Sequence, residues 1–320
     1  MKESDDLYVK LPQDVIFQIL FKLPTRTLLN LRCVSKSFVS LISHPYFLRL
    51  RLSCATAASH HLLYYESSDY TKIYFSFHDS QTFTLCQKLE TPFKSVNGYL
   101  RLVGSSRGVV CLFDTNYFNF VGTVILWNPF IGKYKILPCL QGFRCFKSSF
   151  SHMAVGFGFD HTNFDFKVVK ILYGYDNNEH ELRSEALVYG VKTGSWRNIG
   201  QVVPCFMPKN WCSNAFVHGV VHWMAYKRPQ FDGHLNCIMG FDVVEEIFTL
   251  MELPQNLGPN CKELRLSPLV NEKSLSLFVS HRENMEEVMD LAVCGLPLSF
   301  YAADYDPSLA LIDIGQQLTE

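Results

Sequence analysis

The stretch LPQDVIFQILFKLPTRTLLNLRCVSKSFVSLISHPYF (Leu11–Phe47) decides the fold of the N-terminal part of the chain. Pro12 suits the first position of a helix, and Asp14 places a negative charge in the first turn, where the helix dipole favours it. The next apolar residues follow at intervals of three and four, which predicts a helix with one apolar face. These are Ile16, Ile19, Leu20 and Leu23.

Two further short helices follow from the same stretch. Pro24 ends the first helix, and Thr25 is a candidate N-cap for a second helix from about residue 26 to residue 34. A third helix is expected to carry Phe38, Leu41 and Ile42 and to end before Pro45.

Three short helices form only a thin core. The first helix is apolar beyond one face, because Val15, Phe17 and Phe21 accompany the main stripe. A module this small usually needs a disulfide, a bound metal or a partner protein for stability. Cys33 has no local cysteine with which it could form a disulfide. We therefore infer that part of the apolar surface is meant for another protein. A helical cap packed on the rest of the chain stays open as the alternative.

The stretch resembles the F-box, a motif of the form LP-x-D-V/I-x-x-x-I-L-x-x-LP followed by L-x-x-x-R-x-V-S-K-x-F/W, L-I, P and F. Phe38 stands where the family usually has tryptophan, which keeps an apolar anchor. The resemblance implies docking to a Skp-type adaptor and, through it, to the cullin and RING subunits of a ubiquitin ligase. The implied adaptor-binding residues are Leu11, Pro12, Asp14, Val15, Ile19, Leu20, Leu23, Pro24, Leu28, Arg32, Val34 and Lys36.

Composition limits the remaining possibilities. Aromatic residues make up 14% of the 320 residues and charged residues 18%, which favours a folded, β-rich chain. The net charge of −1 without a long basic run argues against binding along a phosphate backbone, though not against a local basic patch, and we expect no nucleic-acid partner. Neither a secretory signal nor a membrane-spanning run is expected, and eleven irregularly spaced cysteines suggest reduced thiols in the cytoplasm or nucleus.

A strand–turn–strand unit recurs along the second part of the chain. Each copy carries an aromatic residue after its turn, at Phe83, Tyr134, Trp196 and Phe248. A period near 50 residues with several strands per unit is typical of a kelch-type propeller. A β-sandwich would explain the strands but not the regular hairpin, so it ranks second. Other strand candidates are residues 108–113, 154–159, 166–173, 216–226 and 274–280.

This part resembles the F-box-associated domain of plant F-box proteins, in the version related to kelch propellers. The motifs that carry the resemblance are W-N-P-x-x-x-x-Y-x-x-L-P at 127–138, G-F-G-F-D at 156–160, D-F-K-V-V at 165–169, V-H-G-V-V-H-W at 217–223 and F-D-V at 241–243. Together with the F-box, it covers roughly residues 11 to 285.

The fold class we expect is multidomain α+β: a small three-helix F-box followed by an all-β, kelch-like propeller. After Val288 the sequence departs from the family pattern, so it does not decide whether the propeller forms a closed ring. The expected segments are a disordered N-terminus (1–10), the F-box (11–51), a linker (52–59), the propeller-like domain (60–288) and a divergent tail (289–320).

No catalytic constellation emerges from the sequence, and we expect neither a cofactor nor a metal. His218 and His222 would share one face of a strand but lack a third ligand at a useful spacing. Charges around the second and third units are interpreted as solvated loop residues, with target contact as the alternative. They are Asp160, Asp176, Glu179, Glu181, Lys209, Lys227 and Arg228.

These observations favour a non-catalytic, substrate-recognition subunit of an SCF-type ubiquitin ligase that holds an unidentified target protein on its β-domain. The residues that contact the target are unknown from the sequence. An adaptor-binding scaffold or decoy without delivery is one rival. A propeller lectin or hydrolase with an incidental helical cap is the other.

Overall fold

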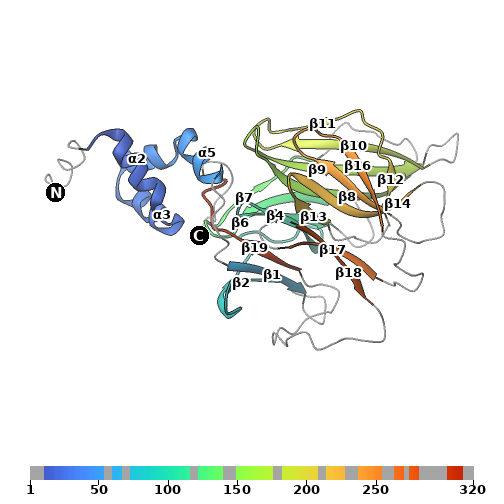
Figure 1. The fold of residues 1–320 in the computed structure, drawn as a ribbon, viewed down its shortest axis with the longest axis horizontal. Coiled ribbons are helices and arrows are strands. Elements are labelled where there is room, and N and C mark those ends of the chain that lie inside the picture. Colours follow the sequence, from blue (N-terminus) through green and yellow to red (C-terminus); the bar gives the residue numbers. More distant parts are fainter. Residues whose placement is uncertain are drawn as a thin grey trace.

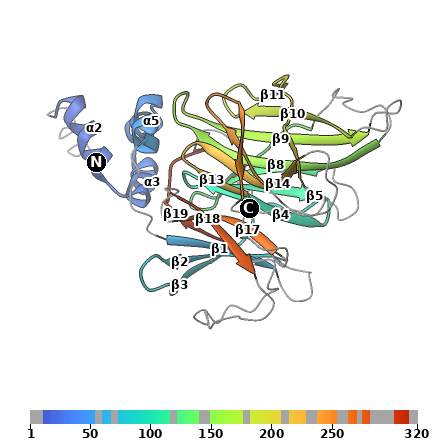
Figure 2. The ribbon, with the colours of Figure 1, turned by 45° about the vertical axis from the view of Figure 1, so that its right-hand side comes forward.

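A computed structural model shows a helical module at one end of a larger β-domain (Figures 1 and 2). It describes residues 11–53, 60–66, 73–115, 122–139, 149–175, 182–207, 214–227, 237–253, 263–269, 274–280 and 301–312. The expected disordered N-terminus, at 1–10, lies outside the described residues.

Within the described residues, the N-terminal module contains four helices where three were predicted: α2 (Gln13–Lys22), α3 (Thr25–Val34), α4 (Lys36–Ile42) and α5 (Pro45–Ser53). The fourth was missed because Pro45 was interpreted only as the end of the third helix, with no helix expected over the rest of the F-box (11–51). Proline instead occupies the first position of α5, where its missing N–H is no loss.

The start of α3 also differs from the prediction. Pro24, with extended backbone angles, is the N-cap, and Thr25 is the first helical residue. The Thr25 hydroxyl therefore does not cap the helix. It donates a hydrogen bond to the carbonyl of Pro307, 2.9 Å away. Ser35 caps α4, its hydroxyl accepting from the Phe38 N–H at 3.3 Å.

Four antiparallel sheets follow one another in the β-domain, each with at least four strands. The first contains β1 (His60–Glu66), β2 (Ile73–Asp79), β3 (Leu85–Leu89) and β19 (Tyr301–Tyr305). The second contains β4 (Tyr99–Ser106), β5 (Val109–Thr115), β6 (Gly122–Asn128) and β7 (Lys133–Ile136).

The third sheet contains β8 (Ser149–Asp160), β9 (Asp165–Tyr175), β10 (Leu182–Gly190) and β11 (Ser195–Asn198). The fourth contains β12 (Cys205–Phe206), β13 (Asn214–Val217), β14 (Val220–Lys227), β15 (Cys237–Asp242) and β16 (Phe248–Glu252). A two-stranded sheet of β17 (Glu263–Leu269) and β18 (Ser274–Ser280) completes the described strands.

The hairpin recognised in the sequence is the outer pair of strands in each of the four sheets: β2–β3, β6–β7, β10–β11 and β15–β16. In three of the four turns, an Asx side chain accepts hydrogen bonds from backbone N–H groups of the turn, which explains the motifs W-N-P and F-D-V. The acceptors are Asp79, Asn128 and Asp242.

Residues 216–226, predicted as one strand, form a hairpin instead. Strands β13 and β14 meet at a two-residue turn of His218 and Gly219, both with positive φ. His218 and His222 therefore do not share one strand, contrary to the prediction.

The sheets pack face to face and bury three apolar clusters between them. The G-F-G-F-D motif belongs to the inner strand of the third sheet. A Cβ atom at Gly156 would lie 2.4 Å from the Trp223 ring, and one at Gly158 would lie 2.3 Å from the Phe216 ring. Both glycines thus allow the third and fourth sheets to approach each other closely.

The C-terminal strand completes the first sheet. β19 pairs with β1 over five residues, from His60↔Tyr305 to Tyr64↔Tyr301. The N-terminal and C-terminal parts of the β-domain thus share one sheet, as in a ring-shaped propeller. Figures 1 and 2 both place β17 and β18 beside that sheet.

Among the described helices, none is long and apolar enough to span a membrane.

Candidate docking surfaces

A line of apolar side chains runs along the exposed surface of α2. Leu11 precedes the helix, and Val15 and Ile19 follow at intervals of four, so the three lie on one side of it. All three are exposed, Ile19 to 49%. Both views place α2 on the side of the helical module away from the β-domain (Figures 1 and 2). Among the described residues, these three side chains thus form an exposed apolar line on α2.

The predicted adaptor-binding residues divide into three groups by exposure. Leu20 and Leu28 are fully buried, so they support the surface from behind. Leu23 and Arg32 are half-buried. The exposed ones are Leu11, Pro12, Asp14, Val15, Ile19, Pro24, Val34 and Lys36.

Arg32 also has a role inside the module. Its guanidinium donates a hydrogen bond to the hydroxyl of Ser43, which links α3 to the end of α4. Lys36, the first residue of α4, is exposed. Tyr46, which the sequence did not single out, is exposed and stacks on Phe17 with ring centroids 5.6 Å apart. Its aromatic side chain was the sequence feature that could have identified it, because aromatic residues are enriched at protein interfaces.

The helical module packs against one face of the β-domain, the face of the short turns. Ile131, in the β6–β7 turn, packs on the core of the module. Arg49 of α5 lies over the ring of Phe164, in the β8–β9 turn, 5.1 Å from its centroid. The module and the β-domain are thus joined by side-chain contacts as well as by the chain.

The opposite face follows from the strand directions. In the second sheet the β4–β5 and β6–β7 turns lie on the side of the helices, and in the third sheet the β8–β9 and β10–β11 turns do. The connections between consecutive sheets therefore leave from the other side. Two of these connections carry nearly fully exposed apolar side chains, Val96 at 90% and Val202 at 87%. Asp114 fixes the first of them by accepting hydrogen bonds from the Ser95 hydroxyl and the Val96 N–H.

Comparison with known proteins decides the family. Residues 9–50 match the F-box domain, and residues 56–271 match the F-box associated beta propeller domain. The chain belongs to the F-box proteins that carry this propeller domain.

Similar proteins come from Arabidopsis thaliana. F-box only protein 8 is 25% identical over 255 residues, covering 78% of this chain and 81% of its own length. Putative F-box protein At4g38870 is 25% identical over 83% of this chain and 63% of its own length. F-box/kelch-repeat protein At3g23880 is 24% identical over 81% of this chain and 70% of its own. The chain thus spans less than two thirds of the length of some relatives that it matches.

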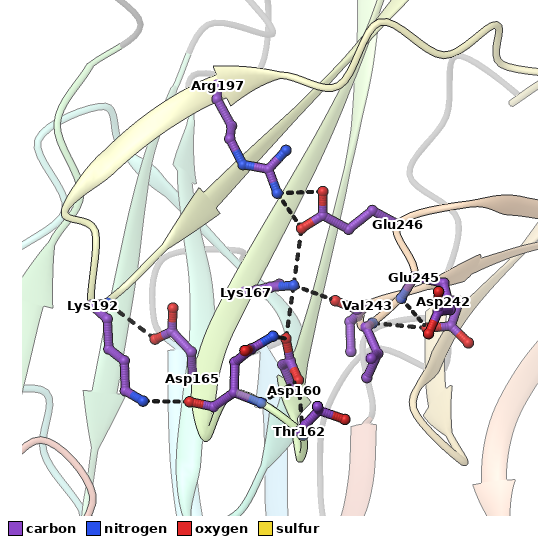
Figure 3. A network of polar contacts seen from close by, with 12 residues as sticks. Asp160, Thr162, Asp165, Lys167, Lys192, Arg197, Asp242, Val243, Glu245 and Glu246 are labelled. Atoms are coloured by element: carbon purple, nitrogen blue, oxygen red, sulfur yellow. Dashed lines mark hydrogen bonds and ion pairs between the residues drawn. The ribbon is translucent and has the colours of Figure 1, made fainter.

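A buried ionic network joins the third and fourth sheets of this F-box protein (Figure 3). The ammonium of Lys167 lies 2.8 Å from Asp160 and 2.9 Å from Glu246, and it donates to the carbonyl of Val243 at 2.6 Å. Arg197 pairs with the same Glu246. Asp160, interpreted from the sequence as a solvated loop charge, is fully buried, so that interpretation was wrong.

Hydrogen bonding determines how the network ionises. Burial raises the pKa of the Asp160 carboxyl, but the Asn163 N–H and Lys167 outweigh it and hold the pKa below 3.8. For Lys167, burial lowers the pKa, while hydrogen bonds to Asp160 and Glu246 raise it above 10.5. The charges are mutually balanced, which fits a structural link between sheets better than a ligand site.

The other predicted charges contribute less to any site. Lys227 pairs with Glu252 at the surface, where such pairs stabilise little. Asp176, Glu179, Glu181, Lys209 and Arg228 lie outside the described residues. Burial lowers the pKa of His222, and within the described ranges no three possible metal ligands come together.

A second buried lysine was not foreseen from the sequence. Lys170 lies 4.9 Å from the centroid of the Trp196 ring and 5.6 Å from that of Phe113. Burial lowers its pKa to about 8. Its neighbours Val169 and Ile171 are buried as well, so no alternation of buried and exposed positions on β9 marked Lys170 in the sequence.

Proposed function

We propose that this F-box protein is the substrate-recognition subunit of an SCF-type ubiquitin ligase. The apolar line of Leu11, Val15 and Ile19, exposed on a module that matches the F-box, carries the proposal. Exposed apolar side chains in one line are typical of helix-docking surfaces in protein complexes. The partner that fits is a Skp-type adaptor, which in turn brings the cullin and RING subunits.

The protein itself performs no covalent chemistry in this proposal. It binds the adaptor with one domain and a target protein with the other, so that ubiquitin transfer from the partner conjugating enzyme becomes effectively intramolecular. The contacts of Ile131 and of Arg49 with Phe164 support this role, because they hold the two domains in a fixed relation.

The target is proposed to bind on the face opposite the helices. That face carries the exposed side chains of Val96 and Val202 on loops of a rigid scaffold, the usual location of binding specificity. The strand β19 favours delivery over the decoy alternative, because it places the C-terminal part of the chain within the first sheet.

Binding to a purified Skp-type adaptor tests the adaptor half of the proposal. Ile19→Glu places a charge in the apolar line, and we expect it to weaken adaptor binding at least about tenfold. Ile247→Glu is the matched control, because Ile247 is exposed to 45% in a turn of the fourth sheet, and Ile19 to 49%. The Ile247→Glu variant should bind the adaptor as tightly as the wild-type chain does. Failure of the wild-type chain to bind, or equal loss in both variants, would sink the proposal.

Proximity labelling under proteasome inhibition tests the target half. Wild-type protein should label proteins that accumulate when it is depleted, and Val96→Asp with Val202→Asp should reduce that labelling without altering adaptor binding. Labelled proteins whose levels do not respond to depletion would favour the scaffold or decoy alternative.

We also propose a cytoplasmic or nuclear location. The described cysteines Cys33, Cys86, Cys111, Cys139, Cys205 and Cys237 are free thiols, as expected in a reducing compartment. A fluorescent fusion located in the secretory pathway would contradict it.

A further inference from the structure

Residues Tyr305–Ile312, which we call the C-terminal strap, contact both domains. The strap leaves the first sheet at the end of β19 and runs to the helical module, as the red segment in Figure 1 shows. The sequence pattern assigned it no role.

The β-domain holds the strap by buried polar contacts. The Tyr305 hydroxyl donates to the carbonyl of Gly108 at 3.1 Å. The Asn128 side-chain amide donates to two strap carbonyls, Ser308 at 3.0 Å and Ala310 at 2.8 Å. The Ser308 hydroxyl donates to the carbonyl of Arg107 at 2.7 Å. Such contacts fix the backbone of the strap to the second sheet.

The F-box holds the strap by apolar burial. Leu309 and Ile312 are buried in one cluster with five buried residues of the helices: Leu20, Leu28, Phe38, Ile42 and Phe47. Arg51 donates to the Phe21 carbonyl and to the Thr25 hydroxyl, both at 3.0 Å, and that hydroxyl donates to Pro307.

The strap divides its side chains between the two cores. Leu309 and Ile312 enter the F-box core, whereas Ala310 and Leu311 enter the core between the second and third sheets. A turn makes this possible: Leu311 has φ of +66°, and the Ile312 N–H donates to the Leu309 carbonyl at 3.2 Å. Neighbouring residues can then point in opposite directions.

We propose that the F-box of this chain is not a self-sufficient unit and depends on the strap for its folded, adaptor-binding form. Two of the seven buried side chains in its described core come from residues more than 250 positions away in the sequence. The strap reaches them only when β19 is paired with β1. A chain whose β-domain is unfolded would therefore present a defective docking surface and would not occupy the adaptor.

Hydrogen exchange on the full chain tests this dependence without any partner. Leu309→Ala should accelerate exchange in α2 and α3 at least about tenfold, because it opens a cavity in a thin core. Leu311→Ala is the matched control, a leucine two positions away in the same strap that enters the other core. It should accelerate exchange mainly in the second and third sheets.

Unchanged exchange in α2 and α3 of the Leu309→Ala variant would overturn the proposal, as would equal acceleration of these helices by both variants. Adaptor binding provides a second measurement, which rests on the proposed function. Leu309→Ala should weaken it more than Leu311→Ala, although neither side chain is at the surface. If the wild-type chain does not bind the adaptor, the proposed function fails, and the exchange pattern still decides the role of the strap.

Discussion

At the scale of single residues, Lys167 shows how the β-domain tolerates buried charge. Its ammonium contacts the carboxylates of Asp160 and Glu246 and one backbone carbonyl, so the lost hydration is replaced on several sides. Removing one partner of such a group leaves the others buried and uncompensated.

Lys167→Met should lower the free energy of unfolding by about 3 kcal/mol, because Asp160 would remain buried without its cation. Chemical denaturation followed by tryptophan fluorescence measures this change. Lys192→Met is the control: Lys192 is exposed and donates to the Asn163 carbonyl, so its loss should change stability by no more than about 0.5 kcal/mol. Equal changes in the free energy of unfolding for the two substitutions would show that the buried network stabilises the protein no more than a surface hydrogen bond does.

Asp160 makes a prediction about pH. Its pKa in the folded protein lies below the ordinary value of 3.8, so between these two values the unfolded state binds more protons. Its contribution to stability is present above pH 3.8 and is lost as the pH falls through the folded pKa. Asp160→Asn should flatten the acid limb of the stability profile. An acid limb as steep as that of the wild type would contradict this assignment.

At the scale of elements, local turn chemistry was predictable and long-range pairing was not. Two of the four outer hairpins, β6–β7 and β10–β11, have a glycine with positive φ in the turn, Gly132 and Gly194, which marks the turn in the sequence. In the turns of the other two, the positive-φ residues are Phe83 and Glu246. The strand β19 was not found, because its partner β1 lies at the other end of the β-domain and no local pattern marks it.

The docking surface was predictable in its residues but not in their exposure. Leu20 and Ile19 are neighbours in an apolar run, and the sequence cannot tell which one faces the core when several faces are apolar. The structure assigns Leu20 to the core because Leu309 and Ile312 pack in the same cluster, and these residues gave no signal in the sequence.

The β4–β5 turn makes a prediction about the strap. Gly108 has φ of +73°, and a Cβ there would lie 2.6 Å from the Ser308 hydroxyl and 2.7 Å from the Asp306 carbonyl. Gly108→Ala should therefore destabilise the protein and displace the strap. Gly132→Ala is the control, because Gly132 has φ of +68° and open space around it.

Both substitutions carry a backbone cost of about 1 kcal/mol, and only Gly108→Ala adds a clash of about 1–3 kcal/mol. Thermal unfolding should show a larger decrease in Tm for Gly108→Ala. Equal decreases in Tm for the two variants would mean that the strap does not pack closely against Gly108.

At the scale of the whole molecule, the two candidate docking surfaces belong to different domains. Helix α2, which carries the apolar line, lies on the side of the helical module away from the β-domain (Figure 1), and the connections that carry Val96 and Val202 leave the face of the β-domain opposite the helices. The strap holds these surfaces in one relation by its contacts with both cores. A receptor that delivers a target needs such a fixed geometry, because small displacements reduce effective concentration at the site of transfer.

Hydrogen exchange of the full chain with and without a purified Skp-type adaptor shows whether α2 and α3 form the docking surface. Exchange in Gln13–Lys22 and Thr25–Val34 should slow when the adaptor is added, with the strands of the second to fourth sheets unchanged. Exchange that is unchanged in both helices, or slowed mainly in the β-domain, would contradict this prediction.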